Sequence, residues 1–432
     1  MGRGGPLRRA IARAPALLAS LGIFVLLALV LRRGVDLPFS DEWDWTELVY
    51  AAHLHTLTFA QLWTPHNEHR MLVPNLIMLG LDAAGGWDVV REQLVSLAVL
   101  ALSQLVVLVL VGRTVPPPLR GICFLVVSAL LLGLAQYENF QWGFQFAWFL
   151  CDLCAVAAVW QLARARRSAA NVALATAAAI TGSVSSLPGL LIWPAGLVAI
   201  ALAPPPRARI TSGWLALGAL TTLAVRWGSR GAPGGASLEH PAALVRYVLV
   251  YLGSPLALSY GVSVSLVAGI VVIGWLAAAV ALALRGPALR RLRLAPWLAL
   301  AAYAVLGAVG TAAGRAGFGF EQAAAPRYVT IAEFAWIGAL AASCIVLPRA
   351  GRYRFAPAAL AAALVLFASL HQSRAGNLAW RLHAAMLRDA RAALARGDAA
   401  GLKDVYPDPA RAGVYLGELA RVRDGVFRTG SP

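Results

Sequence analysis

Three carboxylates and two tryptophans crowd into residues 41–45, which directly follow the first long apolar segment of the chain. Acidic side chains cost free energy near hydrocarbon, so a cluster at this position favours binding or chemistry over a role in stability. Asp41, Glu42 or Asp44 can serve as a general base, and the tryptophans can stack on sugar faces or anchor at the lipid interface. The alternative is an acidic helix start after Ser40, because carboxylates stabilise the positive end of the helix dipole.

A second polar segment lies further along the same loop and reads His-Asn-Glu-His-Arg. His66, Glu68 and His69 are competent metal ligands, but their spacing matches no specific zinc pattern such as H-E-x-x-H. We therefore assign no cofactor and no metal ligand, and a divalent metal stays open. Hydrogen bonding to a polar substrate is the favoured interpretation, with Arg70 offering a fork of donors to a phosphate. A solvated loop is the alternative.

A third polar segment, between two apolar runs, concentrates amides and aromatic side chains. An aromatic belt at the membrane interface would explain Trp142 and its aromatic neighbours. It would not explain Glu138, Asn139, Gln141 and Gln145. Amides beside aromatic rings suit the hydroxyl groups of a carbohydrate, so these residues are candidate substrate contacts.

The last polar segment, residues 314–328, combines glycines with Arg315, Arg327 and Tyr328 at the start of an apolar run. Guanidinium groups stay charged and bind phosphate oxygens in bidentate fashion, which suits a lipid-linked phosphate at the membrane surface. The glycines do not follow the order G-x-G-x-x-G and no strand precedes them, so a nucleotide-binding loop is excluded. The alternative is that the arginines simply end a helix.

The elements that position these residues belong to a membrane protein. The 432-residue chain is 59% hydrophobic and only 13% charged, which is too apolar for a soluble domain. The net charge of +17 does not indicate nucleic acid, because the arginines lie mainly in short tracts between apolar runs. The partner implied by this pattern is the lipid bilayer.

We predict an all-α polytopic protein with about eleven transmembrane helices, within a range of ten to twelve. Alternate connections carry arginines and no acid, so the positive-inside rule places the N-terminus in the cytoplasm and the C-terminus outside, although Arg32 and Arg33 contradict this. The predicted spans are 15–32, 90–112, 119–136, 145–163, 169–186, 187–203, 210–227, 262–284, 295–313, 328–347 and 355–371.

This topology predicts two regions. Residues 1–371 form the transmembrane domain, whose first external loop, residues 34–88, carries interfacial helices. Residues 372–432 form a small extracytoplasmic cap with amphipathic helices at about 376–397 and 409–424. Within the first loop, the short apolar stretch 71–84 is predicted to be re-entrant or interfacial. Its full crossing would require another mis-assigned span, for example one tilted helix over 169–203.

The pattern resembles the GT-C superfamily of polytopic glycosyltransferases, which includes protein mannosyltransferases and the aminoarabinose transferases of lipid A. The resemblance rests on the pair Asp41-Glu42 directly after the first span. A polar, proline-containing loop end at 65–74 follows, then an apolar half-helix, Gly-Gly-Trp at 85–87, and Arg91 at the opening of the next span. It covers residues 15–112 by motif and the remainder by architecture. This chain departs from the family in having His-Asn-Glu-His-Arg where many members have a His-Pro-Pro-Leu type motif.

The resemblance implies an inverting transfer of a sugar from a polyprenyl-phosphate donor to a glycan, lipid or protein acceptor, on the outer face of a bacterial inner membrane. By residue matching, Asp41 is the first choice for the base and Glu42 the second, whereas Asp44 has no family counterpart. The arginines at positions 70, 315 and 327 are candidates to neutralise the phosphate leaving group.

Two other functions fit the same polar segments. A transporter or flippase of lipid-linked glycans would use them as a gate, but such proteins commonly carry internal repeats and paired midplane charges, and the sequence shows no convincing repeat. A glycan polymerase or ligase would differ from the transferase in its substrate more than in its apparatus.

Overall fold

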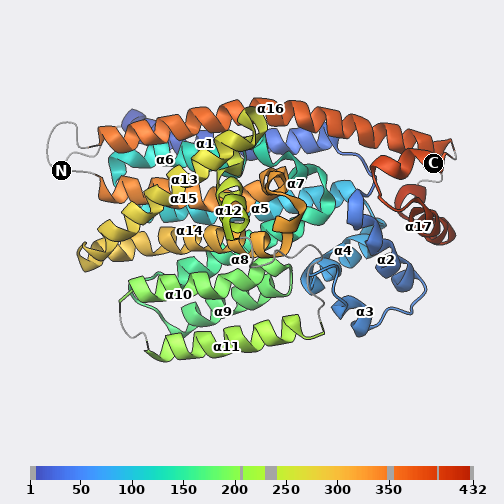
Figure 1. The fold of residues 1–432 in the computed structure, drawn as a ribbon, viewed down its shortest axis with the longest axis horizontal. Coiled ribbons are helices and arrows are strands. Elements are labelled where there is room, and N and C mark those ends of the chain that lie inside the picture. The colour runs from blue at the N-terminus through green and yellow to red at the C-terminus, as the bar shows by residue number, and fades with distance from the viewer. Residues whose placement is uncertain (1–5, 205–207, 229–240, 348–354, 397, 429–432) are drawn as a thin grey trace.

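The computed structural model describes residues 6–204, 208–228, 241–347, 355–396 and 398–428. Within these ranges the chain is built from α-helices and short 3-10 helices, and the described residues form no strand. The long helices run along the long axis of the molecule, with the N-terminus at one end of the bundle (Figure 1). The predicted all-α class is therefore confirmed.

Eight segments of the described chain are long and apolar enough to cross a membrane, which confirms a polytopic membrane protein. The prediction of eleven crossings is not settled, because two of the predicted spans are only the short helices α9 (Ala169–Ser183) and α10 (Ile192–Leu202). The first predicted span lies within helix α1 (Pro6–Arg33). The eight segments are Val89–Thr114, Pro117–Gln141, Gly143–Leu162, Ala208–Arg226, Pro241–Leu284, Ala288–Phe318, Pro326–Val346 and Ala356–Ala395.

The centre of the bundle is α15 (Val329–Val346), whose apolar segment is 89% buried, whereas that of α11 (Ala208–Arg226) is only 17% buried. Small residues explain the central packing. A Cβ atom on Gly338 would lie only 2.7 Å from the carbonyl oxygen of Trp297 in α14 (Ala288–Arg315). Close backbone approach of this kind is how helices pack inside a membrane. Helices α5 (Val89–Thr114), α6 (Pro117–Leu131) and α8 (Phe146–Leu162) also belong to the bundle.

One expected loop contains a helix. The residues between the predicted spans 210–227 and 262–284 were expected outside the bundle, but α12 (Pro241–Gly253) packs antiparallel against α13 (Ala257–Leu284). A Cβ atom on Gly253 would lie 1.8 Å from the carbonyl oxygen of Ser265, so this hairpin requires glycine. The apolar segment that spans both helices is therefore a hairpin and not one straight helix. Residues 229–240 lie outside the described part of the chain.

The predicted boundary between residues 371 and 372 falls inside a single helix, α16 (Ala356–Ala395). Its 40 residues make a rod of about 60 Å, which is twice the roughly 30 Å of a hydrocarbon core. The predicted helix at 376–397 is thus the continuation of the last span. The predicted helix at 409–424 corresponds to α17 (Pro409–Val422).

We call residues 34–88 the first loop and residues 398–428 the tail. The first loop contains η1 (Ser40–Trp45), α2 (Thr46–His53), α3 (Phe59–Trp63) and α4 (Leu72–Gly85). Helices α2, α3, α4 and α17 gather at the end of the molecule opposite the N-terminus (Figure 1). With 14 residues, α4 is about 21 Å long and too short to cross a membrane alone.

The first loop and the tail share one hydrophobic core. Trp43 and Trp45 are almost fully buried in it, together with Tyr406, Tyr415 and Leu419 of the tail. In this structure the two tryptophans are core residues and are not placed to act as sugar platforms or lipid anchors, and the ring of Trp45 packs 5.5 Å from that of Phe144. Large aromatic side chains suit a core because each buries a large apolar area.

Candidate functional site

A cavity of about 590 Å³ lies between the first loop, the connection from α6 to α8, the start of the α10 segment and the ends of α14 and α15. It brings together polar side chains that are far apart in the sequence. Of the predicted site residues, the cavity is lined by Asp41, Glu68, His69, Glu138, Trp142, Gln145, Arg315, Arg327 and Tyr328. The described structure places Glu42, Asp44, His66, Arg70, Asn139 and Gln141 outside this lining.

The three acids of η1 have different surroundings. Asp41 lines the cavity, whereas Glu42 is fully buried behind it. Glu42 accepts hydrogen bonds from the backbone N–H groups of Phe39 (3.0 Å) and Phe144 (2.9 Å). The first of these bonds is the backward half of a capping box, which stabilises the start of a helix. Burial raises the pKa of Glu42 to about 7, although a hydrogen bond with the Glu92 carboxyl and these backbone hydrogen bonds lower it.

Asp44 contacts the tail. Its Oδ1 accepts hydrogen bonds from the hydroxyl groups of Tyr406 (2.7 Å) and Tyr415 (3.1 Å), and Arg411 lies 3.8 Å from the same oxygen. Carboxylates held by several donors are fixed in position and contribute to stability. In this structure Asp44 joins the first loop to the tail, and Glu42 shapes the wall behind the cavity.

The carboxylate of Asp41 is only partly satisfied by the protein. Oδ2 accepts a hydrogen bond from the amide of Asn67 (3.0 Å) and lies 3.4 Å from His66 Nε2. The buried Oδ1 has no hydrogen-bond partner among the described residues. Burial raises the pKa of Asp41, but the interaction with His66 and the nearby His69 outweigh it and lower the pKa below its usual value. Asp41 is therefore ionised at neutral pH, as a general base must be.

A tight turn presents Asn67 and Glu68 to the cavity. The backbone groups of His66 and His69 exchange two hydrogen bonds of 2.9 Å, which close the turn. Asn67 has a φ of 51°, in the left-handed region that asparagine tolerates better than most residues. The sequence His-Asn-Glu-His thus folds into a turn with its two central side chains in the cavity lining.

His69 carries a defined tautomer. Its Nδ1 accepts a hydrogen bond of 3.1 Å from the backbone N–H of Leu187, so the ring proton lies on Nε2. Nε2 is 3.7 Å from Glu68 Oε1. Burial is the main cause that lowers the pKa of His69 to about 4, so the ring is neutral at neutral pH. It is a hydrogen-bond donor at the cavity and not a cation.

Two arginine–carboxylate pairs also line the cavity. Arg315 Nη2 lies 2.5 Å from Glu68 Oε1, and Arg327 Nη1 lies 3.4 Å from Glu138 Oε2. A guanidinium group carries five N–H donors, so both arginines retain donors for an anion in the cavity. Burial raises the pKa of Glu68, but His69 and Arg315 outweigh it and the pKa is lowered, which keeps this carboxylate charged.

Some amide side chains of the third polar segment bind the backbone, and others line the cavity. Asn139 donates to the backbone carbonyl of Arg327 (3.1 Å) and Gln141 donates to that of Trp380 (3.1 Å), so both hold the backbone in place. Gln145 and Trp142 line the cavity. Gln145 Oε1 and Trp142 Nε1 are buried and have no hydrogen-bond partner among the described residues.

The guanidinium of Arg70 is bound to backbone carbonyl groups outside the cavity lining. Its Nε donates to the carbonyl oxygen of Val225 (3.2 Å), and its two terminal nitrogens donate to the carbonyl oxygens of Trp63 and Trp227. The guanidinium also lies 5.2 Å from the centre of the Trp63 ring. Carbonyl oxygens at the end of a helix lack partners within that helix, so Arg70 satisfies the end of α11 and ties it to the first loop.

Several lining residues were not predicted. Phe39, Phe144 and Trp148 form an aromatic wall, and Leu187 begins an apolar wall on the approach to α10. A sequence signal existed for one more wall: Gly307, Gly310 and Gly314 fall on one face of a predicted span. A Cβ atom on Gly310 would meet nothing within 4 Å, whereas one on Gly307 would lie 2.9 Å from a side-chain carbon of Ile331.

The fold and cavity define an all-α polytopic membrane protein with a polar, partly unsatisfied cavity at one end of the bundle. Comparison with protein-family models, with curated proteins and with solved structures gave no match for this chain.

Proposed function

We propose that this protein is an inverting glycosyltransferase of the GT-C type, which moves a sugar from a polyprenyl-phosphate donor to an acceptor hydroxyl. The observation that carries the proposal is the composition of the cavity. An ionised carboxylate, Asp41, shares one cavity with two guanidinium groups, Arg315 and Arg327. A base for an acceptor and cations for a leaving phosphate are the two requirements of this reaction.

Unsatisfied polar atoms also support a carbohydrate ligand. Buried polar atoms are nearly always hydrogen-bonded, so unpartnered ones beside a cavity are candidates to bind a ligand or water there. Four lining residues, Asp41, Glu68, Trp142 and Gln145, each have a buried polar atom without a partner among the described residues. Rotation of these side chains would turn three acceptors and one donor toward the cavity, a set that suits the hydroxyl groups of a sugar beside an aromatic ring.

In the proposed reaction, Asp41 accepts the proton of the acceptor hydroxyl as the acceptor oxygen forms its bond to the anomeric carbon. The bond from that carbon to the phosphate oxygen breaks on the opposite face, and its electron pair remains on the phosphate. Arg315 and Arg327 neutralise this charge. The products are an inverted glycoside and polyprenyl phosphate, and Asp41 then releases its proton to water.

The distribution of arginines suggests on which side of the membrane the cavity lies. Arginine-rich connections at residues 113–120, 164–167 and 285–293 alternate with the polar segments. By the positive-inside rule these connections face the cytoplasm, and the cavity faces the outside of a bacterial plasma membrane. With eleven crossings, the N-terminus and the C-terminus would lie on opposite sides of this membrane.

A second cavity of about 410 Å³, between α10, α13 and α14, is lined only by aliphatic residues.

A reconstitution experiment tests the function. The full-length protein is reconstituted in liposomes. Polyprenyl-phosphate-linked hexoses and pentoses that carry a labelled sugar are added as donors, and a bacterial membrane extract is added as the source of acceptors. We expect release of free polyprenyl phosphate and labelling of a component of the extract. If folded protein cleaves none of these donors, the transferase is rejected. Movement of intact donor across the liposome membrane, without cleavage, would instead support a flippase.

A further inference from the structure

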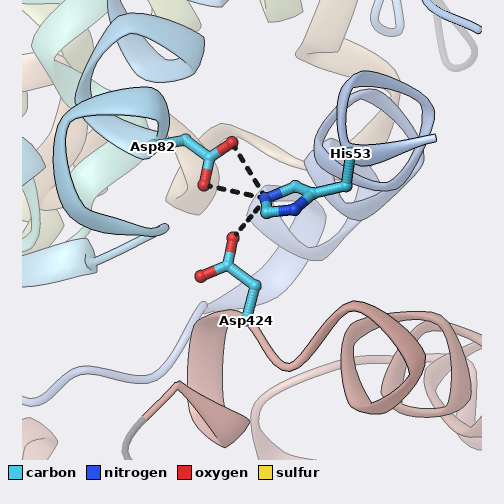
Figure 2. A group of neighbouring side chains, drawn as sticks. All are labelled: His53, Asp82 and Asp424. Atoms are coloured by element: carbon cyan, nitrogen blue, oxygen red, sulfur yellow. Dashed lines mark hydrogen bonds and ion pairs between the residues drawn. The ribbon is translucent and has the colours of Figure 1, made fainter. Parts of the chain in front are cut away.

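Three potential metal ligands from distant segments meet where the first loop contacts the tail. His53 ends α2, Asp82 lies in α4, and Asp424 follows α17. Their side chains converge on one point between the segments (Figure 2). His53 Nε2 lies 3.4 Å from each carboxylate oxygen of Asp82 and 3.1 Å from Asp424 Oδ2. Within the described ranges, this is the group of three or more such ligands whose atoms all lie within 4.8 Å of one another.

These separations suit a small divalent ion. Zinc binds imidazole nitrogen and carboxylate oxygen at about 2.0–2.2 Å, so two ligand atoms of a tetrahedral site are about 3.4 Å apart. The distances from His53 to the two aspartates, 3.4 and 3.1 Å, are close to that value. An ion can therefore occupy the space between the three side chains with only small adjustments of their rotamers.

The electrostatic balance also favours a cation. Asp82 and Asp424 are only 7% and 2% exposed, and burying two adjacent carboxylates costs free energy unless positive charge compensates. The nearby Arg428 contacts Asp36 (3.4 Å) and Asp88 (2.9 Å) instead.

We propose that His53, Asp82 and Asp424 form a binding site for a divalent transition-metal ion, with zinc as the best fit. One imidazole and two carboxylates give a neutral assembly with Zn²⁺, and such a mixed N/O donor set is typical of zinc. Calcium requires six to eight oxygen ligands, which two carboxylates do not supply. The side chain of His53 is 35% exposed, so water can reach the fourth position.

The ion would fasten the tail to the first loop. His53 and Asp424 are 371 positions apart in the sequence. The backbone N–H of Trp87 donates to Asp424 Oδ1 (2.9 Å), which orients the carboxylate and leaves Oδ2 directed at His53. Such outer contacts commonly fix the ligands of a metal site. The proposed role is structural and does not depend on the glycosyltransferase proposal.

The test measures metal binding on the untagged full-length protein in detergent. After treatment with a chelator and its removal, we expect the protein to take up one Zn²⁺ per chain in isothermal titration and elemental analysis. We also expect added Zn²⁺ to raise the Tm and Ca²⁺ to leave it unchanged. Wild-type protein that takes up no stoichiometric zinc and shows no zinc-dependent Tm would overturn the site.

Two variants separate a metal site from a simple tether. Asp424→Asn retains an acceptor for Trp87 but removes a charge, so we expect it to lose zinc binding and the zinc-dependent rise in Tm, while its Tm in chelator stays at or above that of the wild type. His53→Asn should lose zinc binding as well. His55→Asn is the matched control, because His55 is exposed near the cluster with a φ of 58° that asparagine tolerates. Zinc binding by Asp424→Asn and His53→Asn equal to that of the control contradicts the assignment.

Discussion

The cavity and the junction between the first loop and the tail both contain acidic residues of the first loop. The two regions differ in how many hydrogen-bond donors they provide to these carboxylates. At the junction, Asp44 and Glu47 receive hydroxyl and guanidinium donors from Tyr415 and Arg411. In the cavity, Asp41 keeps a buried oxygen without a partner among the described residues. Residue type and position in the chain are almost the same for Asp41 and Asp44. Their neighbours from distant parts of the chain make one a structural group and the other available for chemistry.

The largest expected effect is the difference in turnover between variants of Asp41 and Asp44. Asp41→Asn removes the proposed base but keeps an acceptor for Asn67, so we expect turnover to fall by about 10²–10⁴-fold with expression and folding intact. Asp44→Asn should keep most of the activity and lower the Tm instead. The rate of release of polyprenyl phosphate and the Tm are measured for both variants. Wild-type turnover in Asp41→Asn would reject this residue as the base.

A pair of arginine variants sharpens the same contrast. Arg327→Gln removes a cation of the cavity, and we expect kcat to fall by about 10²–10³-fold because charge on the leaving phosphate is no longer neutralised. Arg411→Gln is the control at the junction, where its exposed ion pairs with Asp44 and Glu47 should contribute only about 0–1 kcal/mol to stability. Equal losses of activity in the two variants would argue against a specific role for Arg327.

Filling the cavity tests whether its open space is used. Gly310→Leu places a side chain where a Cβ atom meets nothing within 4 Å, and we expect kcat/KM to fall by about tenfold to a hundredfold. Gly274→Leu is the matched control, because Gly274 in α13 has the same free surroundings but is exposed outside the cavity. Steady-state kinetics on both variants decide the point. Unchanged kinetics in Gly310→Leu would place the substrate elsewhere.

A smaller effect is expected at the junction. Tyr415→Phe removes a hydroxyl whose single proton is shared between Asp44 (3.1 Å) and Glu47 (3.0 Å). Hydrogen bonds to charged groups contribute about 1.5–3 kcal/mol when buried, and partial exposure here reduces this to about 1–2 kcal/mol. Denaturant unfolding in detergent measures the loss, while kcat should match that of the wild type. A large drop in kcat would show that the tail acts on the cavity.

The buried carboxyl of Glu42, in the same 3-10 helix as Asp41 and Asp44, should make the stability of the folded protein depend on pH. Its pKa in the folded protein is raised to about 7 from an ordinary value of about 4.5, so the folded state binds its proton more tightly than the unfolded chain. The stability from this group is fully present below pH 4.5 and is lost as the pH rises through about 7. We expect the Tm to fall less between pH 5 and 8 in Glu42→Gln than in the wild type, whatever the absolute Tm of the variant. Parallel curves would contradict the assignment.

Much of the fold follows from local patterns. Long apolar runs predict spanning helices because a backbone in lipid must satisfy its own hydrogen bonds. Helices α5 and α8 match their predicted ranges closely, whereas α14 begins seven residues before its predicted span 295–313. Helix α12 was missed because its 13 residues are fewer than a crossing requires. The continuous α16 was missed because its second half is polar on one side, a pattern that does not tell whether a helix ends at the membrane surface.

The candidate site was predictable in its ingredients but not in its assembly. The unusual polar segments flagged Asp41, Glu68 and Arg327, which share the cavity. The same reasoning also selected Arg70, whose donors bind backbone carbonyls. An arginine that binds a phosphate and one that ends a helix look alike in a sequence, because both need only a polar position near an apolar run.

By itself, the sequence determined the class of protein and the polar segments from which a site could be built, because hydrophobic runs and charges act locally on where the chain meets lipid and water. Only the tertiary structure decided which acid faces the cavity. Asp41 and Asp44 differ through Asn67 on one side and Tyr406 and Tyr415 on the other, and two of these partners lie more than 300 residues away. The unsatisfied oxygen that makes Asp41 a candidate base exists because folding brings no donor to it.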